Sequence, residues 1–169
     1  MMLGIPGSGK TSVSEHIADI TKAVHISSDQ FRKHMYDSPE NITELEHDQI
    51  YSMLDYIAEQ ILKSGKSVIY DANLNRSIHR QEKYAICDRI GAAPQLIWVR
   101  TDEEIARKRA TEQADLYPKH RPFGNMKPET FNRLVDQMEE PGQDEKAAIV
   151  NGDDISRDKI KIIIRDLGY

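Results

Sequence analysis

The segment Gly4-Ile5-Pro6-Gly7-Ser8-Gly9-Lys10-Thr11 decides the fold of this chain. It matches the pattern GxxxxGK[ST] in full, and a chance match in a chain of this length has odds on the order of 0.5%. Glycines let the backbone fold into a nest of N–H donors, which is what an anionic ligand requires. The alternative is a glycine-rich turn that binds nothing. The context disfavours that alternative, because an apolar stub precedes the segment and an amphipathic helix follows it.

A helix that begins near Lys10 would direct the positive end of its dipole at a bound phosphate group. Lys10 would neutralise the β- and γ-phosphate oxygens of a nucleotide, and the hydroxyl of Thr11 would ligate Mg²⁺. The sequence therefore predicts a nucleoside triphosphate site. Its expected residues are Gly4, Pro6, Gly7, Ser8, Gly9, Lys10, Thr11 and Ser12.

Composition limits the chain to one folded domain, which we expect to span residues 1–169. The net charge is −5, and 38% of the residues are hydrophobic and 30% charged, a balance that excludes disorder and coiled coil. No apolar run approaches the roughly 18 residues that a membrane span requires. The single cysteine excludes an internal disulfide and indicates a cytoplasmic location.

Short β-branched runs alternate with helical periodicity along the whole chain. Five strands are expected, at residues 1–3, 24–27, 68–71, 95–100 and 147–150. This alternation predicts a parallel sheet with helices on both faces, which is a three-layer αβα architecture. Thr101 and Glu104 have the spacing of a capping box that opens a helix. A first strand of three residues is about half the usual length, so we expect the natural chain to start earlier, which N-terminal sequencing would test.

The segment Ser27-Ser28-Asp29-Gln30-Phe31-Arg32 follows the second expected strand. In open parallel sheets, ligands bind at the carboxyl ends of the strands. Asp29 could accept a proton from an attacking hydroxyl, and Arg32 could hold an anionic group of the substrate or charge in the transition state. In the alternative, Asp29 is a helix N-cap and Arg32 is a solvated surface residue. The segment by itself favours this structural alternative.

The segment Tyr70-Asp71-Ala72-Asn73-Leu74-Asn75 follows the third expected strand in the same way. A carboxylate after a hydrophobic strand can orient the metal ion of a nucleotide site, which makes Asp71 a candidate metal ligand together with Thr11. The alternative is an Asx turn, since Asp and Asn stabilise turns without any ligand. Spacing alone does not separate the two interpretations.

Two groups of basic residues follow the fourth expected strand. Arg107, Lys108 and Arg109 lie on an expected helix, and Lys119, His120 and Arg121 lie in a polar loop. A long basic loop between helices is a candidate lid that closes over phosphates and excludes water. We place this lid at about residues 107–127 and favour Arg107 or Arg109 over Arg121 as its catalytic arginine. The alternative is a solvated helix face followed by a flexible connection.

Together, the GxPGSGK[ST] loop, the SxDxxR segment and the D-A-N-L-N segment resemble the polynucleotide-kinase-like P-loop kinases, a group close to the zeta-toxin-like phosphotransferases. The resemblance covers about residues 1–154. It implies a five-stranded parallel sheet with the P-loop strand at its centre, and Mg²⁺-ATP as phosphoryl donor. It further implies that Asp29 is the general base, that Arg32 contacts substrate phosphate, and that Asp71 and Asn73 bind substrate.

The sequence leaves three hypotheses about function open. The first is a kinase that transfers the γ-phosphoryl group of ATP to a small metabolite, which the negative net charge favours because it gives no general attraction to nucleic acid. The second is a kinase for nucleic-acid 5′ ends, which the resemblance favours. The third is a nucleotide-binding switch that controls a partner protein. In both kinases the lid arginine would be Arg107 or Arg109, and residues 36–49 and the lid would shape the acceptor pocket.

Overall fold

The computed structural model of the protein describes residues 1–38 and 42–169. The five strands expected from the sequence are present. They are β1 (Met2–Leu3), β2 (Val24–Ser27), β3 (Val68–Asp71), β4 (Leu96–Arg100) and β5 (Ala147–Asn151). The helices between and after them are α1 (Lys10–Thr21), α2 (Ser28–Met35), α3 (Glu44–Lys63), α4 (Ser77–Ile90), α5 (Glu103–Thr111), the short 3₁₀ helix η2 (Ala114–Leu116), α6 (Pro128–Asp136) and α7 (Arg157–Asp166).

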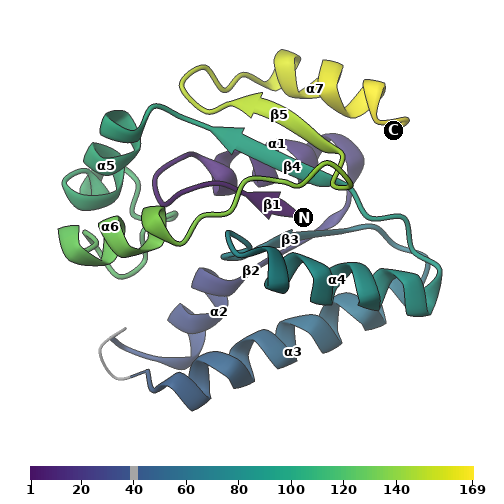
Figure 1. Cartoon of the computed structure of the whole chain (residues 1–169), viewed down its shortest axis with the longest axis horizontal. Coiled ribbons are helices and arrows are strands. Elements are labelled where there is room, and N and C mark those ends of the chain that lie inside the picture. The colour runs from purple at the N-terminus through teal and green to yellow at the C-terminus, as the bar shows by residue number, and fades with distance from the viewer. Residues whose placement is uncertain (39–41) are drawn as a thin grey trace.

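The strands form two parallel sheets, with the orders β1-β4-β5 and β2-β3, that meet along β1 (Figure 1). The expectation of one five-stranded sheet was therefore wrong. The cause lies in the first strand, where Met2 and Leu3 pair with Ile97 and Trp98 of β4. The chain then leaves the extended conformation at Gly4, whose φ is +147°. These two residues form a ladder with β4 alone, although β1 also contacts β3.

Helices cover both sides of the strands, in agreement with the expected three-layer αβα arrangement (Figure 1). On one side, α1 and α7 pack on the sheet through Val13, Ile17, Ile160 and Ile164. On the other side, α3 packs through Ile50, Leu54 and Ala58. Ile69 belongs to the first core and its neighbour Tyr70 belongs to the second. Successive residues of a strand point to opposite faces, so β3 is buried on both.

The two ends of α3, the longest described helix, are determined by the local sequence. Thr43 and Glu46 form a capping box, in which each side chain accepts a hydrogen bond from the other residue's backbone N–H. The helix gives way to Gly65, whose positive φ of +79° favours glycine. No helix within the described residues is both long and apolar enough to cross a membrane.

The expected capping box at the start of α5 was wrong. The N-cap is Asp102, whose carboxylate accepts hydrogen bonds from the backbone N–H groups of Glu104 and Ile105 at 2.9 and 3.2 Å. A carboxylate can satisfy two N–H groups of the first turn and complements the helix dipole, which makes it a strong cap. Thr101 is thereby left for another contact, which holds the glycine-rich loop.

A buried arginine, Arg80, connects helix α4 with the loop after β3 and with the segment that precedes β5. Arg80 of α4 is fully buried and pairs with Glu145 at 2.7 Å. Its guanidinium also donates to the carbonyl oxygens of Leu74, Asn75 and Glu139, each at 3.1 Å. A buried charge is tolerated only when it is paired and hydrogen-bonded in this way. The contacts fix the loop that follows β3, which is part of the candidate site.

Candidate active site

The loop between β1 and α1 is closely packed against the rest of the protein. Gly4, Gly7 and Gly9 have φ values of +147°, +82° and +98°, which L side chains rarely adopt. A Cβ on Gly7 would lie 2.0 Å from the carbonyl oxygen of Ala106 in α5. The hydroxyl of Thr101 donates to the carbonyl oxygen of Ser8 at 2.8 Å. The glycines are therefore required by both conformation and space.

Lys10, the first residue of α1, turns its side chain back over this loop. Its ammonium donates to the carbonyl oxygens of Gly4 and Ile5 at 2.7 and 3.0 Å. Burial lowers the pKa of Lys10 to about 8, while the charge of Asp71 acts in the opposite direction. A cation that is poorly solvated and stands at a helix N-terminus is well suited to bind phosphate oxygens.

Two oxygen-bearing side chains that could hold Mg²⁺, those of Thr11 and Asp71, lie near Lys10 in the sequence or act on it electrostatically. Thr11 lines a cavity of about 470 Å³ together with His25, and the Nε2 of His25 lies 3.1 Å from Oδ2 of Asp71. Asp71 ends β3, is 5% exposed, and acts electrostatically on Lys10. A hydroxyl and a carboxylate fit Mg²⁺, which binds oxygen and takes most of its remaining ligands from water and phosphate. Within the described residues no cluster of three or more His, Cys, Asp or Glu side chains could hold a metal by itself.

The two asparagines after Asp71 have structural contacts. Oδ1 of Asn73 accepts a hydrogen bond from the backbone N–H of Asn75 at 3.2 Å, which is the Asx turn considered from the sequence. Oδ1 of Asn75 accepts a hydrogen bond from the backbone N–H of Gly4 at 3.4 Å. Asn75, which sequence reasoning missed, thus connects the loop after β3 with the loop after β1. Its place two residues beyond Asn73 was the only signal that could have found it.

Asp29 and Arg32 lie together on the first two turns of α2. The cap of this helix is Ser27, whose hydroxyl accepts from the backbone N–H of Gln30, so Asp29 is not the N-cap. Nη1 of Arg32 donates to Oδ1 of Asp29 at 3.0 Å, and the guanidinium lies 5.4 Å from the ring centroid of Tyr51. The Asp29 side chain is 55% exposed and that of Arg32 only 12%. Arg32 therefore holds in place a carboxylate that remains accessible.

Arg107 contacts its own helix and α6. Its guanidinium pairs with Glu103 at 2.8 Å, contacts Asn132 and lies 4.6 Å from the ring centroid of Phe131. These contacts join α5 to α6. Arg109 donates to the carbonyl oxygen of Gly152 at 2.9 Å, and a Cβ on Gly152 would lie 2.2 Å from the carbonyl oxygen of Ser8. Arg109 thus lies beside the glycine-rich loop.

Arg121, which we expected to be a weaker candidate than the other two arginines, acts electrostatically on Lys10. Burial lowers the pKa of Arg121, while the charge of Asp29 raises it. Arg121 in turn lowers the pKa of Lys10. The three side chains are therefore within electrostatic reach of one another. The basic run Lys119-His120-Arg121 in a long loop was the available signal for this placement.

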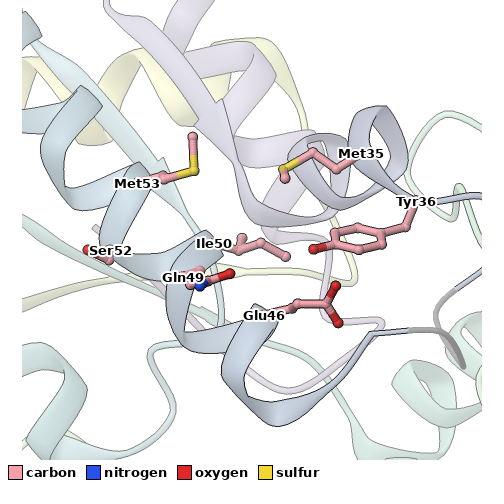
Figure 2. A pocket seen from close by; sticks show the side chains of 7 residues that line it. All are labelled: Met35, Tyr36, Glu46, Gln49, Ile50, Ser52 and Met53. Carbon is pink, nitrogen blue, oxygen red and sulfur yellow. The ribbon is translucent and has the colours of Figure 1, made fainter.

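A second cavity lies beside this site, between the end of α2 and the first half of α3 (Figure 2). Its volume is about 220 Å³, and Figure 2 shows its lining side chains, which are Met35, Tyr36, Glu46, Gln49, Ile50, Ser52 and Met53. The Tyr36 hydroxyl hydrogen-bonds the carboxylate of Glu46. Part of the expected pocket-shaping segment, residues 36–49, thus lines a cavity, and residues 39–41 lie outside the described chain.

Solved structures share this fold along almost the whole chain. Kti12 from Chaetomium thermophilum, in complex with ADP-AlF3, superposes with a TM-score of 0.79 at 17% identity, over 99% of this chain and 97% of that one. The APS kinase CysC from Mycobacterium tuberculosis, in complex with AMPPNP and APS, gives a TM-score of 0.69 at 16% identity, with 99% and 95% covered. A gluconokinase from Sinorhizobium meliloti gives 0.64 at 20% identity, with 98% and 86% covered. At such identities the likeness shows the fold alone.

No curated protein matches the sequence. A family model does match, over residues 1–141, which include the glycine-rich loop, Asp29, Asp71 and Arg121. The family is described as AAA domain, and it is a kinase-like family of P-loop NTPases. With most of its length matched, the chain belongs to the AAA domain family.

Proposed function

We propose that this protein is an ATP-dependent kinase that transfers the γ-phosphoryl group of Mg²⁺-ATP to a hydroxyl acceptor. One observation carries the proposal: Lys10, Asp29 and Arg121 come from the phosphate loop, the second strand–helix junction and the lid, and they converge within electrostatic reach. Phosphoryl transfer depends on positioning and on charge stabilisation more than on covalent chemistry. Two cations and an accessible carboxylate that act on one another electrostatically supply charges that this reaction needs.

Each residue has a defined task in this proposal. The backbone N–H groups of the loop and Lys10 Nζ hold the phosphates, with Ser8 and Gly9 just before α1 and Ser12 in its first turn. Asp29 orients the acceptor hydroxyl and accepts its proton as the new P–O bond forms. Arg121 compensates the negative charge that develops on the transferred group. Thr11 and Asp71 would hold Mg²⁺, which neutralises phosphate charge.

The remaining arginines have secondary tasks in this proposal. Arg109 adjoins the loop through Gly152 and would contact the nucleotide, while the ion pair of Arg107 with Glu103 holds the base of the lid. We extend the lid over residues 107–127 and treat it, with the rest of 1–169, as one kinase domain. Lid closure over the phosphates would exclude water and so favour transfer over hydrolysis.

The acceptor is a small hydroxylated metabolite or nucleotide in our proposal. The net charge of −5 gives nucleic acid no general attraction. Nε of Arg32 is buried and has no hydrogen-bond partner among the described residues, so Arg32 can donate to an anionic group of the acceptor. The resemblance to polynucleotide kinases supports a nucleic-acid 5′ end as the other acceptor. A steep fall of oligonucleotide affinity with salt would favour that acceptor, and a flat dependence would exclude it.

A second candidate function is an ATP-binding regulatory NTPase without an acceptor. The observation that favours it is the fold similarity to Kti12, whose structure contains ADP-AlF3. A switch of this kind would hydrolyse ATP slowly, at a rate that does not depend on Asp29. It would also bind a partner protein with an affinity that depends on the nucleotide.

The test is transfer of labelled γ-phosphate from Mg²⁺-ATP to two acceptor sets, a 5′-hydroxyl oligonucleotide and a panel of small hydroxylated metabolites. Asp29→Asn keeps the size of the side chain and one acceptor oxygen but cannot accept the proton. Loss of transfer by about 10²–10⁴-fold in this variant, with unchanged ATP affinity, supports the kinase. Equal turnover in the wild type and Asp29→Asn supports the switch.

A further inference from the structure

Glu15 connects the nucleotide-binding helix with the lid. It lies on α1 one helical turn after Thr11, and its side chain is 33% exposed. Oε1 of Glu15 pairs with the ammonium of Lys119 at 2.5 Å, and Oε2 lies 3.1 Å from Nε2 of His120. One carboxylate therefore contacts two consecutive lid residues through its two oxygens.

The same lid turn has further contacts with the two helices beneath it. Nε2 of Gln30 in α2 donates to the carbonyl oxygen of Lys119 at 2.5 Å. Nδ1 of His120 lies 3.5 Å from Oγ of Ser12. The lid segment is thus held to α1 through side chains and to α2 through a backbone carbonyl. It therefore bridges these two helices.

The backbone turn at residues 117–121 connects these anchored residues with Arg121. The backbone N–H groups of His120 and Arg121 both donate to the carbonyl oxygen of Tyr117 at 2.9 Å. Fixing Lys119 and His120 therefore also fixes the backbone of Arg121, the next residue, whose guanidinium acts on Lys10 and Asp29.

We propose that Glu15 is a positioning residue for phosphoryl transfer: by holding Lys119 and His120 it closes the lid and places Arg121 over the reacting phosphate. This inference rests on the proposed kinase function. Glu15 itself touches no reacting atom and acts through Arg121. Its length and two oxygens suit the task, since both lid partners must be held at once.

Electrostatics is consistent with this role. Burial raises the pKa of Glu15, but the hydrogen bonds and charges of Lys119 and His120 outweigh that effect and lower the pKa overall. The carboxylate is therefore ionised at neutral pH and can attract the lid cations. A partly exposed pair of this kind is weak enough for the lid to open for substrate exchange.

A double-mutant cycle tests the inference, because it separates action through Arg121 from an independent effect. Arg121→Ala should reduce kcat by about 10²–10³-fold, as for loss of one transition-state donor. Glu15→Ala should reduce kcat about five- to ten-fold, with KM for ATP changed less, because a smaller fraction of complexes has the lid closed. In the Arg121→Ala background, Glu15→Ala should have almost no further effect. If the fold-reductions in kcat of the two single variants multiply in the double variant, the proposal is overturned.

A matched control variant and a second measurement distinguish failure of the Glu15 anchor from failure of the kinase function. Asp19 lies one turn further along α1 and pairs with Arg157 of α7, so Asp19→Ala removes a comparable ion pair away from the lid and should leave kcat unchanged. Hydrogen exchange of residues 117–124 in the presence of Mg²⁺-AMPPNP needs no acceptor. Faster exchange in Glu15→Ala than in Asp19→Ala supports the anchor, and equal exchange overturns it. Absence of transfer by the wild type would contradict the kinase function while the exchange experiment still decides the anchor.

Discussion

Replacement of Lys10 by methionine should stabilise the folded protein while abolishing ATP binding. Burial lowers the pKa of Lys10 to about 8, with further lowering from Arg121, while Asp71 and Asp29 raise it. The difference from the ordinary value of 10.5 corresponds to about 3 kcal/mol that favours the unfolded state at pH 7. Lys10 is only half-buried, and its hydrogen bonds to loop carbonyls would be lost. We therefore expect a net stabilisation of about 1–2 kcal/mol.

The sign of the pH dependence follows from the same pKa. Between about pH 8 and 10.5 the folded state has lost the proton of Lys10 while the unfolded state keeps it, so the free energy of unfolding rises with pH. Methionine does not titrate. The stability advantage of Lys10→Met should therefore be largest near neutral pH and shrink above pH 8. A bound triphosphate favours the charged ammonium, so the affinity of the wild type for ATP should fall as pH rises above about 8.

Urea unfolding at neutral and alkaline pH, together with calorimetric titration of ATP, measures both effects. For a chain of this length, 1–2 kcal/mol corresponds to a rise in Tm of about 3–6 °C. Lys22→Met is the matched control, because Lys22 follows α1 with a side chain that is 80% exposed, and it should leave both quantities almost unchanged. The reasoning is refuted if Lys10→Met is no more stable than the wild type at pH 7, or if its advantage grows with pH.

Two further substitutions test the framework around the site. Arg80→Met leaves Glu145 without its buried partner and should cost about 3–5 kcal/mol in urea unfolding, whereas exposed Arg89→Met should cost under about 1 kcal/mol; similar costs for both would contradict the anchoring role of Arg80. Gly7→Ala places a Cβ 2.0 Å from a backbone oxygen at positive φ and should abolish ATP binding in calorimetry. Gly142→Ala, where a Cβ meets no atom within 4 Å, should bind ATP normally, and binding by Gly7→Ala would disprove the packing argument.

The strands, helices and phosphate loop were predictable from the sequence because their signals are local. The run 68–71 is β-branched, ends in an acid and forms β3 with the same bounds. Pro128 begins α6, where its missing N–H costs nothing. Because β2 and β3 pair in parallel, Ser27 lies opposite Asp71. Asp71 and Asp29, which follows Ser27 by two residues, are therefore both at the carboxyl ends of these strands. These features need only neighbouring residues or a topological rule.

The features that sequence reasoning missed depend on contacts between distant residues. Arg107 and Arg121 are both basic residues of the expected lid, and what distinguishes their placement is the pairing of Lys119 and His120 with Glu15, which lies 105 positions from His120. Thr101 was expected to cap a helix, but the loop approaches so closely that its hydroxyl bonds Ser8 instead. No periodicity encodes these approaches.

The most direct test of the central claim is the fate of the γ-phosphate when the acceptor is not chosen in advance. The protein is incubated with γ-labelled Mg²⁺-ATP and a small-molecule extract of cells, and the label is separated into inorganic phosphate and organic phosphoesters. The kinase account predicts label in an organic phosphoester with the wild type, and its loss in both Asp29→Asn and Lys10→Met. Label released only as inorganic phosphate, at the same rate in the wild type and Asp29→Asn, would contradict it.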